Sequence, residues 1–348
     1  MRAYPHSHTL MLGAFLALAG CDQYEPVEST QQGFRGTAMV ELAEPGEDPA
    51  AAAQAAVPAA LPQVPPGGPK AGDVYKNVKV LGHLDAGQFG RLMASITAWV
   101  APKEGCVYCH EAANFADDSK YTKVVSRRMI EMTLAINTGW TDHVKDTGVT
   151  CYTCHAGQNI PANNWSRDPG PVRSSRFDGN QDGQNFPVRS VGLSSLPFDP
   201  YTPFLLGASE IRVNAPQALP TEPPHAPDIH SAERTYGLMM HMSDSLGVNC
   251  TFCHNSRAFA SWEESNPQRV TAWHGIRMVR QINTDYIEPL GPVFPQNRLG
   301  ALGDPLKANC STCHQGLNKP LGGLSMLKDH PELGTPAPPA TTAAATEE

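Results

Sequence analysis

Four stretches of the chain carry the pattern Cys-x-x-Cys-His. On a helical turn, residues i, i+3 and i+4 lie on one side, so the two thiols and the imidazole face the same ligand. This pattern attaches c-type haem, because the thiols bond to the haem vinyl groups and the imidazole nitrogen binds the iron. The attachment cysteines are Cys106, Cys109, Cys151, Cys154, Cys250, Cys253, Cys310 and Cys313. The iron-binding histidines are His110, His155, His254 and His314, which predicts a tetrahaem cytochrome c.

Three other uses of paired cysteines compete with haem attachment. Zinc binds cysteine pairs, but four repeats that all end in histidine would be a coincidence. A disulfide framework suits an exported chain, but such scaffolds are usually shorter than about 100 residues. A thioredoxin-like redox pair does not require the histidine that follows. The four motifs account for every cysteine except Cys21, which favours haem attachment.

The composition fits a chain that folds around large cofactors. The 348 residues include 32 Pro and 30 Gly, and 17% are charged, against a usual ~25%. The formal net charge is −8 and no basic stripe is present, which excludes a nucleic-acid binder. Apolar macrocycles would supply core surface that side chains otherwise provide. We therefore expect a mainly α fold with extensive irregular chain.

The first residues predict export and a lipid anchor. Residues 9–20 are an apolar run, too short for a membrane span of ~20 residues but suited to a secretory signal. The run ends in Leu-Ala-Gly before Cys21, which resembles a bacterial lipobox. We expect cleavage before Cys21 and a diacylglycerol on its thiol, although a plain signal peptide with an incidental cysteine would look similar. The mature chain would then be periplasmic and anchored to the membrane by lipid.

The chain divides into four expected regions. They are a signal peptide at 1–20, a lipid-anchored segment at 21–72, a tetrahaem domain at 73–330 and a disordered tail at 331–348. Within the second region, residues 43–72 are rich in Ala and Pro and predict an extended linker. Residues 160–230 contain no haem motif and are expected to include one or two short strands.

A helical segment is predicted before each motif, and each of these segments contains methionine. The four segments are 86–100, 124–137, 231–246 and 270–286. The motif histidines are 45, 99 and 60 residues apart, which indicates two haem pairs separated by a long connection. We expect an internal duplication with pseudo-twofold symmetry.

The residues alone leave the sixth iron ligands open. A methionine thioether would close the iron to small molecules and raise its potential. The candidates are Met93 for the first haem, Met129 or Met132 for the second, Met239, Met240, His241 or Met242 for the third, and Met278 for the fourth. His143 lies twelve residues before His155 and could reach another haem.

In these motifs and in three further segments the chain resembles the tetrahaem cytochrome c subunit of the photosynthetic reaction centre of purple bacteria. The resemblance covers roughly residues 73–316 and includes the paired spacing of the motifs and the lipobox. It also rests on three segments: TYGLMMH at 235–241 leading into GVNCTFCH at 247–254, SLPFDP at 195–200, and HGIRM at 274–278.

The resemblance implies a ligand set. It assigns Met93, Met129 and Met239 as sixth ligands of the first three haems. It implies that the fourth haem has two histidine ligands, His143 and His314, which leaves Met278 as a packing residue. Arg269 matches an arginine that lies near a haem and raises its potential.

The resemblance also implies a function, which is electron transfer without enzymatic chemistry. Soluble cytochrome c or a high-potential iron–sulfur protein would donate electrons, and the third haem would re-reduce the photo-oxidised bacteriochlorophyll special pair. The partners would be the L and M subunits, with H in the complex, at the periplasmic face of the inner photosynthetic membrane. Two alternatives are a redox enzyme with an open haem and a free periplasmic carrier.

Overall fold

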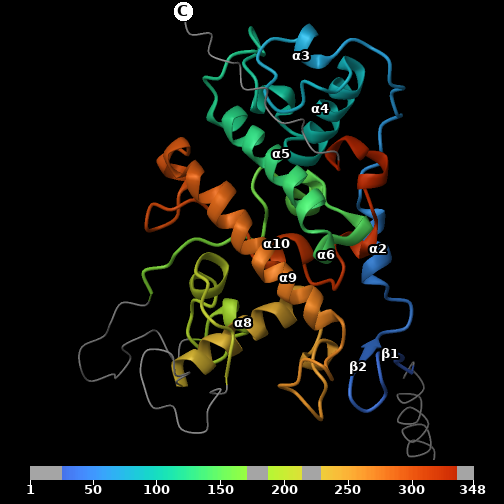
Figure 1. Ribbon diagram of the computed structural model, residues 1–348, viewed down its shortest axis with the longest axis vertical. Coiled ribbons are helices and arrows are strands. Elements are labelled where there is room, and N and C mark those ends of the chain that lie inside the picture. The colour runs from blue at the N-terminus through green and yellow to red at the C-terminus, as the bar shows by residue number, and fades with distance from the viewer. Residues whose placement is uncertain (1–25, 171–186, 214–228, 335–348) are drawn as a thin grey trace, which may run out of the picture.

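The computed structural model describes residues 26–170, 187–213 and 229–334 (Figure 1). Its strands are β1 (Glu28–Gln32) and β2 (Met39–Ala43). Its α-helices are α2 (Pro49–Ala55), α3 (Ala71–Val74), α4 (Ala86–Val100), α5 (Tyr121–Gly139), α6 (Thr141–Val144), α7 (Cys151–His155), α8 (Ile229–Leu246), α9 (Gln268–Gln281) and α10 (Cys310–His314). Short 3₁₀ or π segments used below are η1 (Gly105–Tyr108), η3 (Arg189–Val191), η4 (Thr202–Leu206), η5 (Cys250–Phe252), η6 (Ile282–Ile287), η9 (Pro320–Gly323) and η11 (Pro331–Leu333).

The helices that precede the first two motifs and the helix that precedes the third motif lie at opposite ends of an elongated molecule. Figure 1 shows α4 and α5 at one end, α8 and the β1–β2 hairpin at the other, and α10 between them. One buried cluster contains Leu92, Trp99 and Leu134 from α4 and α5. A second cluster contains Leu238 of α8 and Ile276 of α9. Helical segments and irregular chain dominate, as the sequence predicted.

The helices before the motifs are confirmed. α4 has the predicted bounds, α5 extends two to three residues beyond the predicted range at each end, and α8 begins two residues earlier than predicted and ends as predicted. The last segment begins as α9 and continues as the π helix η6. In η6 the buried Asn283 side chain donates to the carbonyls of Leu205 (3.0 Å) and Ala308 (2.9 Å), which ties the segment to two distant parts of the chain.

The N-terminal hairpin was not expected. β1 and β2 pair antiparallel, with Ser29 opposite Leu42. The hairpin contacts the chain that follows the third motif, where the Ser256 N–H donates to the Thr37 carbonyl (3.0 Å). The N-terminal segment is thereby placed beside the third motif.

The Ala/Pro-rich segment at 43–72 is not the extended linker that we expected. It contains α2, whose Gln54 side chain donates to the carbonyl of Gly322 (2.8 Å) in η9. The Arg91 guanidinium donates to the carbonyl of Leu61 (2.8 Å), and Lys70 pairs with Asp85 (2.8 Å) at the start of α4. Arg91 of α4 and Asp85 at its start therefore bind groups of this segment and hold it on the domain surface.

The expected tail boundary is also wrong, because residues 331–334 are packed. Leu333 is fully buried, and its carbonyl accepts from the Asn137 side chain (3.0 Å). Glu332 pairs with the buried Arg91 (3.3 Å). The remainder of the expected tail, together with the signal peptide and Cys21, lies outside the described residues.

The strands expected within 160–230 are not found in its described part. Trp165 and Lys307 form an isolated antiparallel bridge there, and the residues around it form turns and short helical segments. Among the residues that the structure describes, no helix has both the length and the apolar character needed to cross a bilayer.

Candidate haem sites

The second and fourth motifs form two α-helices, α7 and α10, with the same kind of capping. Before α7, the Thr150 N–H donates to the hydroxyl of Thr153 (3.0 Å). Before α10, the Asn309 side-chain oxygen accepts from the N–H of Thr312 (3.1 Å). Such reciprocal caps fix where a helix begins. Both helices are followed by a residue in the left-handed conformation, Ala156 and Gln315.

The first and third motifs share a different local structure. They form the 3₁₀ turns η1 and η5 rather than α-helices. His110 stacks on Phe115, with 4.8 Å between ring centroids and 18° between planes. His254 stacks on Phe259 in the same way, at 4.3 Å and 2°. Local structure therefore groups the first motif with the third and the second with the fourth.

All four motif imidazoles are oriented by a backbone carbonyl. The Nδ1 atoms of His110, His155, His254 and His314 lie 3.0, 2.9, 2.9 and 2.9 Å from the carbonyl oxygens of Phe115, Gln158, Phe259 and Leu317. A carbonyl only accepts, so Nδ1 carries the proton and the lone pair is on Nε2. This is the tautomer and support that metal-binding histidines use.

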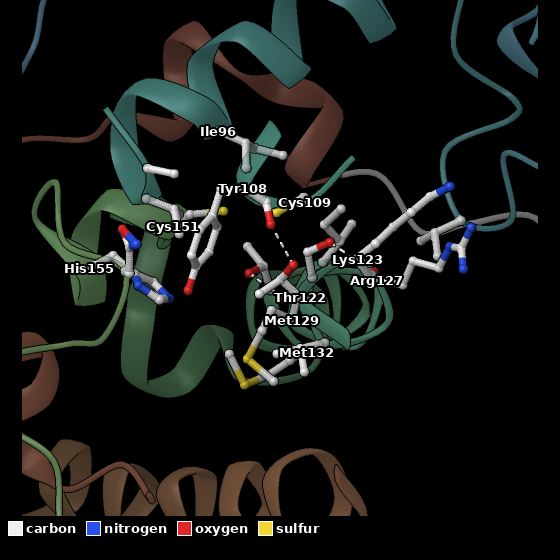
Figure 2. A pocket seen from close by; sticks show the side chains of 18 of the residues that line it. Ile96, Tyr108, Cys109, Thr122, Lys123, Arg127, Met129, Met132, Cys151 and His155 are labelled. Carbon is white, nitrogen blue, oxygen red and sulfur yellow. Dashed lines mark hydrogen bonds between the residues drawn. The ribbon is translucent and has the colours of Figure 1, made fainter. Parts of the chain in front are cut away.

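A large apolar cavity lies between the first two motifs. Its volume is about 700 Å³, and it is lined by residues of both motifs together with Met93 of α4 and Met129 of α5. Figure 2 shows the Met129 and Met132 side chains leaving α5 on the same side. The candidate sixth ligands of the first two sites therefore line the same cavity as the attachment cysteines.

His143 of α6 lies next to the fourth motif rather than the second. Its ring centroid is 6.0 Å from that of His314, and the two planes are at 66°. Its Nδ1 donates to the Thr271 carbonyl (2.9 Å), and burial lowers its pKa. Gly275 of α9 makes room for the ring, since a Cβ there would lie 2.5 Å from His143 Cε1. His143 is thus a neutral imidazole held in the same way as the motif histidines.

The candidates for the third site point in different directions. Met239 and Met242 pack against the buried cluster around Leu238. Met240 is 37% exposed. His241 is buried and lies against Tyr201, with 4.8 Å between ring centroids. The fourth-site alternative Met278 is buried in the same cluster, which fits a packing role.

Arg269 is held close to the third motif. Its guanidinium lies over the Trp262 ring (4.0 Å to the centroid) and donates to the Ser261 carbonyl (2.7 Å). Burial raises the pKa of Cys253 to about 11, an effect that the positive charge of Arg269 opposes. The residue predicted to lie beside a haem is therefore within electrostatic reach of an attachment cysteine.

Two contacts connect the motifs with one another. The Sγ atoms of Cys154 and Cys313 are 2.8 Å apart, which joins the second motif to the fourth. The hydroxyls of Ser245 in α8 and Ser311 in α10 are 2.6 Å apart, which joins the helix before the third motif to the fourth motif.

Sequence reasoning missed the groups that orient the imidazoles. Phe115 and Phe259 could have been found, because both motifs continue with a phenylalanine five residues after the histidine. Thr271 and Gly275 gave no such signal, because they reach His143 from a helix that is 128 residues away in sequence.

Free cysteine pairs, imidazoles with an available Nε2 and an apolar cavity together define a c-type cytochrome. The family described as the photosynthetic reaction centre cytochrome C subunit matches residues 23–334. The chain belongs to this family.

Similar proteins carry the same description. The photosynthetic reaction center cytochrome c subunit of Rubrivivax gelatinosus is 52% identical over 339 residues, which is 97% of this chain and 92% of that protein. The subunit of Thermochromatium tepidum is 54% identical over 266 residues, 76% of this chain and 65% of the relative. The subunit of Roseobacter denitrificans is 41% identical over 286 residues, 79% and 76% of the two chains.

Family membership establishes the general function. The chain is an electron-transfer subunit of the photosynthetic reaction centre complex, an electron carrier rather than an enzyme, and it uses covalently bound haem c. The residues present fit this cofactor. All eight motif cysteines are free, and the cavity places cysteines of the first, second and fourth motifs against apolar side chains.

Proposed function

We propose that the protein holds four haems and passes electrons from soluble periplasmic donors to the special pair of the reaction centre. The observation that carries this proposal is the uniform support of the four motif histidines. Each offers Nε2, because a carbonyl about 3 Å away occupies Nδ1. A c-type haem supplies a one-electron carrier at each of these positions, and the chain supplies attachment, axial ligands and surroundings.

The proposed sixth ligands are Met93, Met129 and Met239 for the first three sites and His143 for the fourth. Met93 and Met129 both line the cavity, as does the alternative Met132, and the family resemblance favours Met129 over Met132. His143 is supported by its distance from His314. Two imidazoles on opposite sides of one metal have centroids roughly 6 Å apart, since metal–nitrogen bonds are about 2 Å long. Arg269 is proposed to raise the potential of the third haem.

The two-pair arrangement with an internal repeat is supported by local structure. The 3₁₀ turn with a His–Phe stack occurs in the first and third motifs, and the capped α-helix occurs in the second and fourth. A duplicated unit of two motifs would produce this alternation.

The contacts between motifs suggest the order of the sites. The cavity joins the first site to the second, the Cys154–Cys313 contact joins the second to the fourth, and the Ser245–Ser311 contact joins the fourth to α8. Electrons would therefore pass from the first site through the second and fourth to the third.

The third site is proposed to be nearest the membrane. We propose that the mature chain begins at Cys21, which carries a diacylglycerol. Glu28 of β1 is seven positions after Cys21, a reach of at most about 25 Å. The hairpin contacts the chain after the third motif through Thr37 and Ser256. The anchor would thus hold the third site towards the L and M subunits and leave the first site towards soluble donors.

The donors are proposed to be a soluble cytochrome c or a high-potential iron–sulfur protein. The chain carries a formal net charge of −8, to which haem propionates would add. A negative surface attracts basic donors, and salt weakens this attraction. The oxidation rate of a basic donor should therefore fall as ionic strength rises, and a rate independent of salt would contradict the docking proposal.

Haem counting and flash spectroscopy test the central proposal. Pyridine haemochrome analysis of the purified subunit should give four haems per chain. A flash given to membranes containing the complex should oxidise a c-type haem as the special pair is re-reduced. Three haems or fewer, or no light-induced oxidation, would overturn the proposal. Carbon monoxide added to the reduced protein should leave every haem unchanged, because an open iron would indicate a redox enzyme.

A further inference from the structure

A buried polar contact on α8 is not explained by haem ligation. His241 follows Met239 by two residues, and at 3.6 residues per turn the two side chains leave the helix on nearly opposite sides. His241 is 5% exposed. It therefore faces a different part of the molecule from the proposed ligand of the third haem.

His241 contacts the chain around η4. The Tyr201 hydroxyl lies 3.3 Å from His241 Nδ1, and the rings meet edge to face at 85°. On its other side the Tyr201 ring lies 5.1 Å from that of Trp165. The imidazole is therefore packed against Tyr201, whose ring is itself packed against Trp165.

One turn later, Ser245 makes contact with the fourth motif. Its hydroxyl lies 2.6 Å from the His241 carbonyl and 2.6 Å from the Ser311 hydroxyl. Ser311 stands between the two attachment cysteines of α10. The Ser245 carbonyl also accepts from the N–H of Gly316 (2.8 Å), two residues after the motif histidine. Ser245 is 1% exposed, so these bonds are shielded from water.

We call this set of residues the α8–α10 bridge; its members are Tyr201, His241, Ser245 and Ser311. It joins the helix that carries Met239 to the helix that carries the fourth attachment site. A hydrogen bond to a buried group holds its partner in place, and removing that partner leaves the buried group unsatisfied. The two helices are consequently fixed relative to each other at this point.

We propose that the α8–α10 bridge is a positioning device for electron transfer, which sets the separation of the third and fourth haems and tunes their potentials. This rests on the four-haem arrangement proposed above. The rate of transfer depends on how the protein places the cofactors, and nearby hydrogen bonds adjust haem potentials. Its residues bind no iron and act through the groups that do.

The test uses hydroxyl deletions in the complete reaction-centre complex. Ser245→Ala and Ser311→Ala should keep four haems, slow electron redistribution between the third and fourth haems several-fold after a flash, and shift the potentials of those two haems. Ser311→Thr restores a hydroxyl and should recover much of the parent rate. Ser95→Ala removes an equally buried hydroxyl from α4 (4% exposed) and should change neither quantity.

Unchanged rates and potentials in both serine variants with four haems present would overturn the proposal. Tyr201→Phe keeps the ring and removes only the hydroxyl. It therefore replaces the serine variants as the test if one of them loses a haem. Parent-like kinetics and potentials in that variant would then overturn the proposal. A parent protein with fewer than four haems would instead overturn the proposed function.

Discussion

The imidazole of His143 lies 6.0 Å from that of His314, although the two residues belong to segments far apart in the sequence. Both rings donate from Nδ1 to a backbone carbonyl, so their Nε2 atoms are the free ones. Burial lowers both pKa values, that of His314 to about 4, and keeps the imidazoles neutral as metal ligands require. This relationship supports two histidine ligands at the fourth site.

Replacing His143 by methionine should raise the potential of one haem only. A thioether stabilises reduced iron relative to an imidazole, and we expect a rise on the order of 0.1 V within the ~0.8 V range that axial ligands span. Redox titration of the four α-bands measures it. Met278→Leu is the matched control, because Met278 is buried among apolar side chains. A shift in Met278→Leu together with an unchanged potential in His143→Met would show that Met278, not His143, is the ligand.

Adding one methyl group at Gly275 should displace His143 without touching the motif. A Cβ there would lie 2.5 Å from Cε1 and 2.8 Å from Nδ1 of the imidazole, which is too close for either to remain in place. Gly275→Ala should therefore remove the sixth ligand from one of the four haem irons, so that carbon monoxide binds to one reduced haem. Gly139→Ala at the exposed end of α5, where a Cβ meets nothing within 4 Å, should bind none. Four closed haems in Gly275→Ala would contradict the assignment of His143.

The sequence was informative where local patterns decide structure. α4 has the predicted bounds because its apolar periodicity and the Asp85 and Gln88 side chains at its start are local signals. The repeated motifs also located all eight proposed attachment cysteines by spacing alone. The pairing of His143 with the fourth motif could be inferred only from the family resemblance, since nothing near His143 indicates which distant helix it meets.

The features that the sequence missed depend on distant contacts. The Ala- and Pro-rich composition of residues 43–72 predicted a linker. In the structure Arg91 donates to the Leu61 carbonyl and holds this segment in place. The β1–β2 hairpin has few strong strand-forming residues, and the chain after the third motif provides its support through Ser256. Such contacts join residues up to hundreds of positions apart and leave no periodic signal.

Truncating Leu333 should destabilise the domain, contrary to the expectation of a disordered tail. The side chain is fully buried beside α4 and α5, and Leu→Ala in a core costs about 2–5 kcal/mol. Guanidinium unfolding, followed by the visible haem spectrum, measures the loss. Leu302→Ala removes the same atoms from a side chain that is 54% exposed and should change stability by less than about 0.5 kcal/mol. Equal effects of the two substitutions would show that residues 331–334 are not part of the fold.

Asp118 should make the first site sensitive to acid. Its carboxylate pairs with Arg127 (2.8 Å) and Lys123 (3.2 Å), two residues that line the haem cavity, and the Asn77 side chain donates to it (2.9 Å). The hydrogen bond from Arg127, together with those from Asn77 and Lys123, holds the pKa of Asp118 well below its usual 3.8. A depressed carboxylate pKa stabilises the fold above the unfolded value, and the stabilisation disappears as pH falls through the folded value.

Asp118→Asn should therefore lower stability at pH 7 and flatten the loss of stability below about pH 4, where the Asp118 carboxylate of the unfolded parent takes up a proton before that of the folded parent. Unfolding midpoints measured from pH 7 down to pH 2 would reveal both changes. Glu44→Gln neutralises an exposed carboxylate in the N-terminal segment and should leave the pH profile as it is. A parallel downward shift of the Asp118→Asn curve at every pH would mean that the carboxylate acts through packing rather than through its charge.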